Sequence, residues 1–300
     1  MTPSSLVFKP TRKRLAIFLG PGILLYGFMV IVPILGAFRH SLYTDFNFQF
    51  RFVGVQNYVE MLTDGDFWFS FRNNLIILGL SLLLQISLAF VIAVMMNSRL
   101  IRFAKFSRAV MFFPVILSAV VVGFIWVLIY NVHWGLLNTL LAAVGLAGWQ
   151  QLWLDNPSIV IFSITVPLMW QYVGLFLVIF LAGLSAIPAE LLEAAEIDGA
   201  NGFTKTIHVT LPLLASTWRV VLILAISGAV KVFEQPYVMT RGGPGISSTV
   251  LAQYAYNMSF ARFKLTYGST VAVGMLVLSF VMIALTWLFM RYVVFRGKEV

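Results

Sequence analysis

Six long apolar runs recur along this chain of 300 residues and restrict its fold more than any other feature. A helix needs about 20 mostly apolar residues to cross the hydrocarbon core of a bilayer, so each run is long enough to be a span. We therefore predict transmembrane helices at residues 15–38, 74–97, 107–130, 158–184, 213–233 and 268–290.

The composition supports a membrane chain. Hydrophobic residues make up 60% of it and charged residues 10%, which leaves too few charges to cover a water-facing surface. This excludes an ordinary soluble enzyme and a disordered protein, and the unbroken apolar runs lack the alternation of an outer-membrane barrel. The predicted fold class is an all-α polytopic membrane protein with six transmembrane helices.

Lysine and arginine are distributed unevenly between the two sides of these spans. Loops rich in these residues stay in the cytoplasm, so the richer side is the cytoplasmic one. We predict a cytoplasmic tail at 1–14, a transmembrane domain at 15–290 and a cytoplasmic tail at 291–300. The net charge of +9 is thereby explained without a nucleic-acid partner. The cations on the richer side are Lys9, Arg12, Lys13, Arg14, Arg99, Arg102, Lys105, Arg108, Lys205, Arg291, Arg296 and Lys298.

The chain lacks the residue patterns of an enzyme site. It has no cysteine, no HExxH zinc motif and no GxxxxGK[ST] phosphate loop. Its histidines, His40, His133 and His208, are far apart in the sequence. We therefore expect no metal, no cofactor, no ATP site and no catalytic residue in this chain, which disfavours an intramembrane enzyme.

The segment 185–212, between the fourth and fifth spans, differs from the other cytoplasmic segments. Residues 189–198 favour a helix, Gly199 permits a left-handed turn, and a second short helix can follow at about 203–210. Because such short helices are marginal alone, a partner is expected to hold them, and the acids favour a basic partner. The alternative is a solvated helix–turn–helix that only connects two spans. The charged residues of this segment are Glu190, Glu193, Glu196, Asp198 and Lys205.

Within this segment, Glu193-Ala194-Ala195, then Asp198-Gly199-Ala200, then Leu211-Pro212 resembles the EAA motif of ABC importer membrane subunits. The form at 193–200 is typical of the carbohydrate-uptake branch. The element Thr240-Arg-Gly-Gly-Pro244 is similar to that of MalF-like permeases. The resemblance to this binding-protein-dependent transport family extends over nearly the whole chain.

The resemblance implies an assembly in a bacterial-type plasma (inner) membrane. This chain would pair with a second, related permease chain, above two ATPase subunits that bind ATP and Mg, and an external solute-binding protein would deliver a sugar or oligosaccharide. The 185–212 segment would be the cytoplasmic coupling helix–turn–helix, with Glu193 pairing with a basic residue of the ATPase and Gly199 setting the angle between the helices. The implied coupling residues are Glu193, Ala194, Ala195, Asp198, Gly199 and Ala200.

Candidate substrate-path residues lie in the fourth and fifth spans, because sugars bind to aromatic faces and hydrogen-bonding groups. Each candidate has a structural alternative: interhelical packing for the residues of span four, close helix approach for Ser227, and an ion pair for Lys231 with Glu234. At three positions where the resemblance implies sugar contact, this chain has the apolar residues Ala225, Ala229 and Val232. The candidates are Trp170, Gln171, Tyr172, Ser227, Lys231 and Glu234.

Two other functions keep the same spans. An importer of glycerol-phosphate would favour cations along the path, where the sequence offers Arg219 and Lys231. A stand-alone secondary carrier would work without ATPase subunits, but commonly keeps an acid within a span, and none lies in the middle of a predicted span. The sequence does not identify the sugar.

Overall fold

The computed structural model describes residues 11–46, 49–97, 103–289 and 292. Most of the two predicted tails lies outside the described residues. So do six of the cations that predict the orientation, namely Lys9, Arg99, Arg102, Arg291, Arg296 and Lys298.

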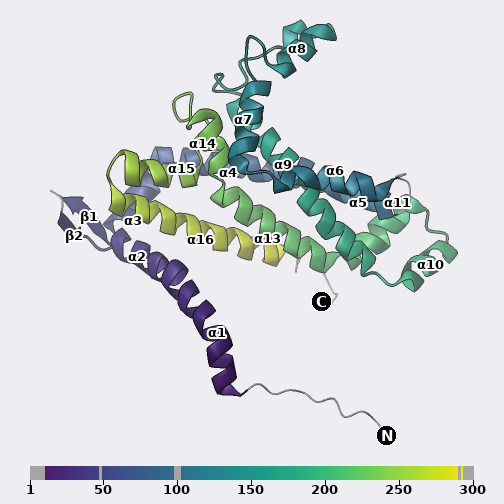
Figure 1. Cartoon of the computed structure of the whole chain (residues 1–300), viewed down its shortest axis with the longest axis horizontal. Coiled ribbons are helices and arrows are strands. Elements are labelled where there is room, and N and C mark those ends of the chain that lie inside the picture. Colours follow the sequence, from purple (N-terminus) through teal and green to yellow (C-terminus); the bar gives the residue numbers. More distant parts are fainter. Residues whose placement is uncertain (1–10, 47–48, 98–102, 290–291, 293–300) are drawn as a thin grey trace.

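Five helical segments in the described part of the chain are long and apolar enough to cross a membrane. A bent pair of helices makes a sixth when it is counted as one span. The predicted all-α polytopic fold class is confirmed (Figure 1). The five segments are Arg12–Ser41, Gly65–Asn97, Val160–Ser185, Ala215–Thr240 and Leu265–Phe289.

Several of these segments consist of more than one helical element. The first joins α1 to α2 and the second joins α4 to α5, each through a π-helical turn, whereas α9 and α16 are unbroken. The fifth span has a break between α13 and α14. The bounds are α1 (Arg12–Tyr26), π turn (Gly27–Ile31), α2 (Val32–Ser41), α4 (Gly65–Leu80), π turn (Ser81–Ile86), α5 (Ser87–Asn97), α9 (Val160–Ser185), α13 (Ala215–Lys231), α14 (Glu234–Thr240) and α16 (Leu265–Phe289).

The prediction of one continuous helix at 107–130 is wrong. This segment forms α6 (Ala104–Ile116) and α7 (Ala119–Ile129), and their axes differ by 98°. Leu117 and Ser118 between them have extended backbones, with ψ of 145° and 138°. Pro114 lacks the amide hydrogen that would bond one turn back, so the last turn of α6 is already weakened.

Helix α9 forms the centre of the bundle. In its most apolar window 56% of the residues are buried, against none in the first span, and α1 extends away from the other helices in Figure 1. Gly174 of α9 allows α6 to approach closely, because a Cβ at this position would lie 2.1 Å from the Met111 carbonyl oxygen.

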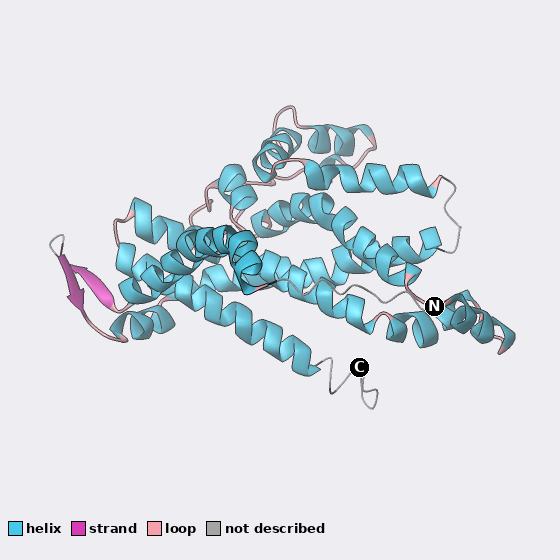
Figure 2. Cartoon of the chain, turned by 60° about the horizontal axis from the view of Figure 1, so that its bottom comes forward, coloured by secondary structure: helices cyan, strands magenta, loops and turns pink. Residues whose placement is uncertain are grey.

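Short elements connect the spans. Strands β1 (Tyr43–Phe46) and β2 (Gln49–Phe52) form an antiparallel hairpin, which the all-α prediction did not include (Figure 2). The other short elements are α3 (Gln56–Thr63), α8 (Leu136–Ala143), a 3₁₀ turn (Ala147–Trp149), α15 (Leu251–Tyr256) and a π turn (Asn257–Ala261).

One carboxylate joins the starts of two spans to α15. Asp64 caps α4 by accepting hydrogen bonds from the backbone N–H groups of Asp66 and Phe67, and it also accepts bonds from the hydroxyls of Tyr254 and Tyr267. Burial raises the pKa of Asp64, but these hydrogen bonds outweigh it and hold the pKa below its ordinary value. We call Asp64, Tyr254 and Tyr267 the Asp64 cluster.

Candidate functional site

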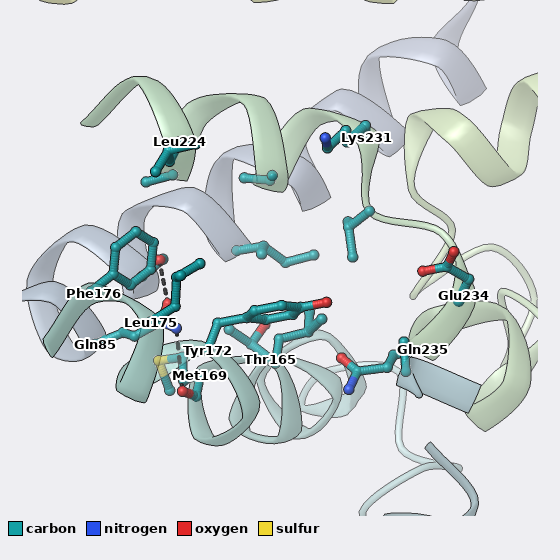
Figure 3. A pocket seen from close by; sticks show the side chains of 18 residues that line it. Gln85, Thr165, Met169, Tyr172, Leu175, Phe176, Leu224, Lys231, Glu234 and Gln235 are labelled. Carbon is teal, nitrogen blue, oxygen red and sulfur yellow. Dashed lines mark hydrogen bonds between the residues drawn. The ribbon is translucent and has the colours of Figure 1, made fainter. Parts of the chain in front are cut away.

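A cavity of about 540 Å³ lies inside the bundle. Helices α9 and α13 supply eleven of its eighteen lining residues, and the others come from α4, the following π turn, the start of α7 and the α13–α14 region (Figure 3). Its volume is in the range of small-molecule sites, roughly 300–1,000 Å³. The polar side chains on its wall belong to Ser81, Gln85, Thr165, Tyr172, Lys231, Glu234 and Gln235.

The π-helical turn of the second span forms part of this wall. The Ser81 hydroxyl donates a hydrogen bond to Gln85 Oε1 at 2.5 Å, and Gln85 Nε2 donates to the Met169 carbonyl oxygen of α9 at 3.2 Å. Gln85 therefore joins the second span to α9 while it lines the cavity.

The break between α13 and α14 lies beside the cavity. Val232 is extended, with ψ of 132°, and ends α13. Asn74 of α4 donates to the carbonyl oxygens of Ala229 and Val230, at 2.6 and 3.2 Å, and accepts from the Leu251 amide at 2.9 Å. These bonds satisfy polar groups that the helix end leaves without a helical partner.

The alternative of an ion pair between Lys231 and Glu234 is wrong for this structure. Among the described residues the one ion pair joins Glu196 to Lys205. A spacing of three residues brings side chains together only on a continuous helix, and the break falls between these two. Both side chains instead line the cavity, Lys231 from the α13 wall opposite Tyr172 (Figure 3).

Gln171 joins the two helix breaks. It is only 1% exposed, and its Nε2 donates to the Leu117 carbonyl oxygen at the α6–α7 break, at 2.8 Å. Its Oε1 accepts from Gln235 Nε2 in the first turn of α14, at 2.6 Å. One buried amide of the unbroken central helix thus fixes the positions of both broken spans.

The six candidate path residues divide into two groups. Tyr172, Lys231 and Glu234 line the cavity, whereas Trp170, Gln171 and Ser227 are not among its lining residues. Trp170 packs edge-on against Trp126 of α7. Whether any of the six touches substrate stays a prediction.

Other residues of the cavity wall bear on what the sequence analysis expected of the substrate path. The positions where the resemblance implies sugar contact, Ala225, Ala229 and Val232, line the same cavity. Sequence reasoning missed Gln235. Pro236 was an available signal, since proline suits the first turn of a helix and so marks a new start near 234.

Charge in the cavity wall is limited to one cation and one anion, Lys231 and Glu234, and Arg219 does not line it. No group of three or more metal-ligating side chains occurs in the described part of the chain.

The 185–212 segment folds locally as a helix–turn–helix. It contains α10 (Ala189–Ile197), α11 (Gly202–Lys205), a π turn (Thr206–Thr210) and α12 (Leu211–Leu213). Gly199 has φ of +83°, the left-handed conformation that favours glycine. The Asn201 side chain then caps α11 by accepting from the Thr204 amide at 2.9 Å.

The implied coupling residues lie on and just after α10. Ala195 is buried and Ala200 is half-buried, while Glu193, Ala194, Asp198 and Gly199 are exposed. Glu196 pairs with Lys205 and so braces the two short helices against each other. Ile197 and Phe203 are 87% and 76% exposed, which leaves an apolar surface beside the unpaired acids Glu190, Glu193 and Asp198 in the described structure.

These features define a class of protein: a polytopic helical membrane protein with an internal cavity and an exposed acidic loop at one end. The sequence matches the family described as "Binding-protein-dependent transport system inner membrane component" over residues 85–296. The chain therefore belongs to this family, as the EAA resemblance predicted.

The chain aligns with related proteins over most of their length. The chain is 33% identical to the probable ABC transporter permease protein YurN of Bacillus subtilis over 287 residues, which cover 94% of this chain and 96% of that protein. It is 33% identical over 259 residues to the trehalose/maltose transport system permease protein MalF of Thermococcus litoralis, covering 85% and 87%.

A solved structure shares the fold. It is the crystal structure of a bacterial ABC transporter involved in the import of the acidic polysaccharide alginate. One of its chains matches this one with a TM-score of 0.79 at 21% identity, covering 93% of this chain and 95% of that chain.

Proposed function

We propose that this chain is a permease subunit of an ATP-driven, binding-protein-dependent sugar importer and forms half of its translocation path. The observation that carries the proposal is the position of the 185–212 segment. It connects the end of α9 directly to the start of α13, the two helices that supply most of the cavity wall.

This connection explains how a partner could change access to the cavity. An ATPase that binds α10 through Glu193 and the apolar surface of Ile197 and Phe203 would displace α9 and α13 together, because the segment connects these two helices. The Glu196–Lys205 pair would keep the two short helices at one angle, so closure of the ATPases becomes a movement of the cavity walls. Alternating access by this route needs a second, related permease chain for the other half of the path.

The topology in the membrane follows from the same proposal. The 185–212 segment, the end of α5 and the start of α6 lie at one end of the bundle, and the hairpin and α3 lie at the other (Figure 1). ATPases bind in the cytoplasm, so the first end would be cytoplasmic. We also propose cytoplasmic termini, because the distribution of lysine and arginine along the sequence favours them. The solute-binding protein would then deliver its sugar at the hairpin end.

The cavity favours a largely uncharged, hydroxyl-bearing solute. Its wall combines aromatic side chains with amides and hydroxyls, and its single cation lies in the same wall as Glu234. A phosphate ester would require a cluster of cations or N–H donors. We therefore rank glycerol-phosphate below sugar.

A stand-alone carrier is the second candidate, because Glu234 lies in the cavity wall and within the apolar segment that extends to Thr240. Such a carrier would move its solute in vesicles that lack ATPase subunits.

The test is Glu193→Lys in the complete importer. We expect the variant to reach the membrane but to co-purify with less ATPase and to lose uptake of maltose, trehalose or lactose, whichever the wild type transports. Glu60→Lys is the matched control for membrane level and ATPase retention, since it makes the same charge change at an exposed position of α3, away from the end that the ATPases would contact. Normal ATPase retention and uptake by Glu193→Lys would refute the coupling role.

A further inference from the structure

Some polar groups of the cavity wall already form hydrogen bonds within the protein, whereas others do not. Ser81 and Gln85 bond to each other, Gln85 also bonds to α9, and the Thr165 hydroxyl donates to the Ile161 carbonyl oxygen at 2.6 Å. Tyr172, Lys231 and Glu234 are exposed enough for water to reach them. Gln235 is 1% exposed, and its Oε1 is buried with no hydrogen-bond partner.

The hydrogen bonds of Gln171 determine which atom of the Gln235 amide has no partner. Leu117 presents a carbonyl oxygen, which can only accept, so Gln171 must point its Nε2 at it. Gln171 Oε1 therefore faces Gln235 and requires a donor, which is Gln235 Nε2. The Gln235 oxygen then remains as an unpaired acceptor, turned toward the Tyr172 side in Figure 3.

A buried acceptor without a partner is unusual, because folded proteins satisfy nearly all of their buried polar groups. Among the described residues three side chains have buried polar atoms without a hydrogen-bond partner, namely the Trp218 donor, the Gln235 acceptor and both amide atoms of Gln253, and of these only Gln235 lines the cavity. Its position in the first turn after a helix break places it where the wall can move.

We propose that Gln235 Oε1 is a ligand-binding acceptor of this cavity and that the transported solute donates a hydroxyl hydrogen to it. Gln171 is the positioning residue that holds the amide in this orientation. The inference rests on the proposed function, since it assigns one contact of the sugar. The oxygen is covered in the arrangement described here, so the bond forms in a state in which the breaks have let the wall open.

Equilibrium dialysis of radiolabelled maltose, trehalose and lactose against the purified importer, without its binding protein, tests this contact. Gln235→Met keeps the shape of the side chain but removes both amide atoms, and we expect it to weaken sugar binding about tenfold. Gln235→Glu keeps an acceptor oxygen but removes the N–H that bonds to Gln171, so we expect it to weaken sugar binding by about threefold, less than Gln235→Met does.

Gln253→Met is the matched control, because Gln253 of α15 is also fully buried with unpaired amide atoms but does not line the cavity. It should bind sugar as the wild type does. If Gln235→Met does not assemble, Gln235→Asn replaces it, since this variant keeps an amide but withdraws the oxygen by one methylene group.

Three outcomes would overturn the inference. Unchanged sugar binding by Gln235→Met excludes the contact. Equal losses in Gln235→Met and Gln235→Glu show that only the donor to Gln171 matters. Failure of the wild-type importer to bind or take up any of the sugars refutes the proposed function together with the contact, and is distinguishable from the first two outcomes by the wild-type result.

Discussion

The contact between α6 and α9 at Gly174 gives the sharpest test of the packing. In Gly174→Ala the new Cβ would lie 2.1 Å from the Met111 carbonyl oxygen and 2.8 Å from Phe112 Cα. Real Cβ atoms do not approach other atoms closer than 3.0 Å, and both neighbours belong to the backbone, so α6 must move by about 1 Å.

The expected cost follows from three effects. Overpacking costs about 1–3 kcal/mol, and a shift of α6 also strains the Gln171–Leu117 hydrogen bond, which is worth about 1 kcal/mol. Alanine is favoured over glycine within a helix by about 1 kcal/mol, which offsets part of this loss. The net destabilisation is about 1–3 kcal/mol, or several degrees in the apparent unfolding temperature, with about 2–4 °C for each kcal/mol.

The assay is thermal unfolding of the purified chain in detergent, followed by tryptophan fluorescence. Gly79→Ala in α4 is the matched control, because nothing lies within 4 Å of the added Cβ, and it should unfold at or slightly above the wild-type temperature. A Gly174→Ala variant as stable as Gly79→Ala would refute the close packing of α6 on α9.

Three further predictions concern stability and are checked by the same unfolding assay. Asp64 has a lowered pKa, so its charged form stabilises the fold above the ordinary value of 3.8, and this contribution is lost as the pH falls through the lower folded value. The stability difference between the wild type and Asp64→Asn should therefore shrink on acidification, and a constant difference between pH 7 and pH 3 would contradict the Asp64 cluster. Asn74→Leu leaves two carbonyl oxygens and one amide at the α13 end without their partner, and we expect a loss of about 1–3 kcal/mol, which a neutral result would contradict. Glu196→Gln breaks an exposed ion pair and should change stability by less than about 1 kcal/mol, and a larger loss would show that the pair is more than a surface brace.

The sequence by itself determined the class of the protein and the place of the helix–turn–helix at 185–212. Apolar runs of span length identify membrane helices, because the bilayer imposes a fixed length that local composition reports directly. Gly199 and the good helix formers before it likewise act within a few residues, so the turn after α10 could be predicted from the chain alone.

Only the tertiary structure decided where the cavity lies and which polar atoms of its wall have hydrogen-bond partners. The α6–α7 break at Leu117 is stabilised by Gln171, which is 54 residues away, and the end of α13 is held by Asn74, which is more than 150 residues away. Spacing along one helix suggested an ion pair between Lys231 and Glu234, but the break turns both toward the cavity. Gln235 has no local signature as a binding residue, because its spare oxygen is defined by hydrogen bonds from other helices, and a linear sequence does not show which distant groups satisfy which buried atoms.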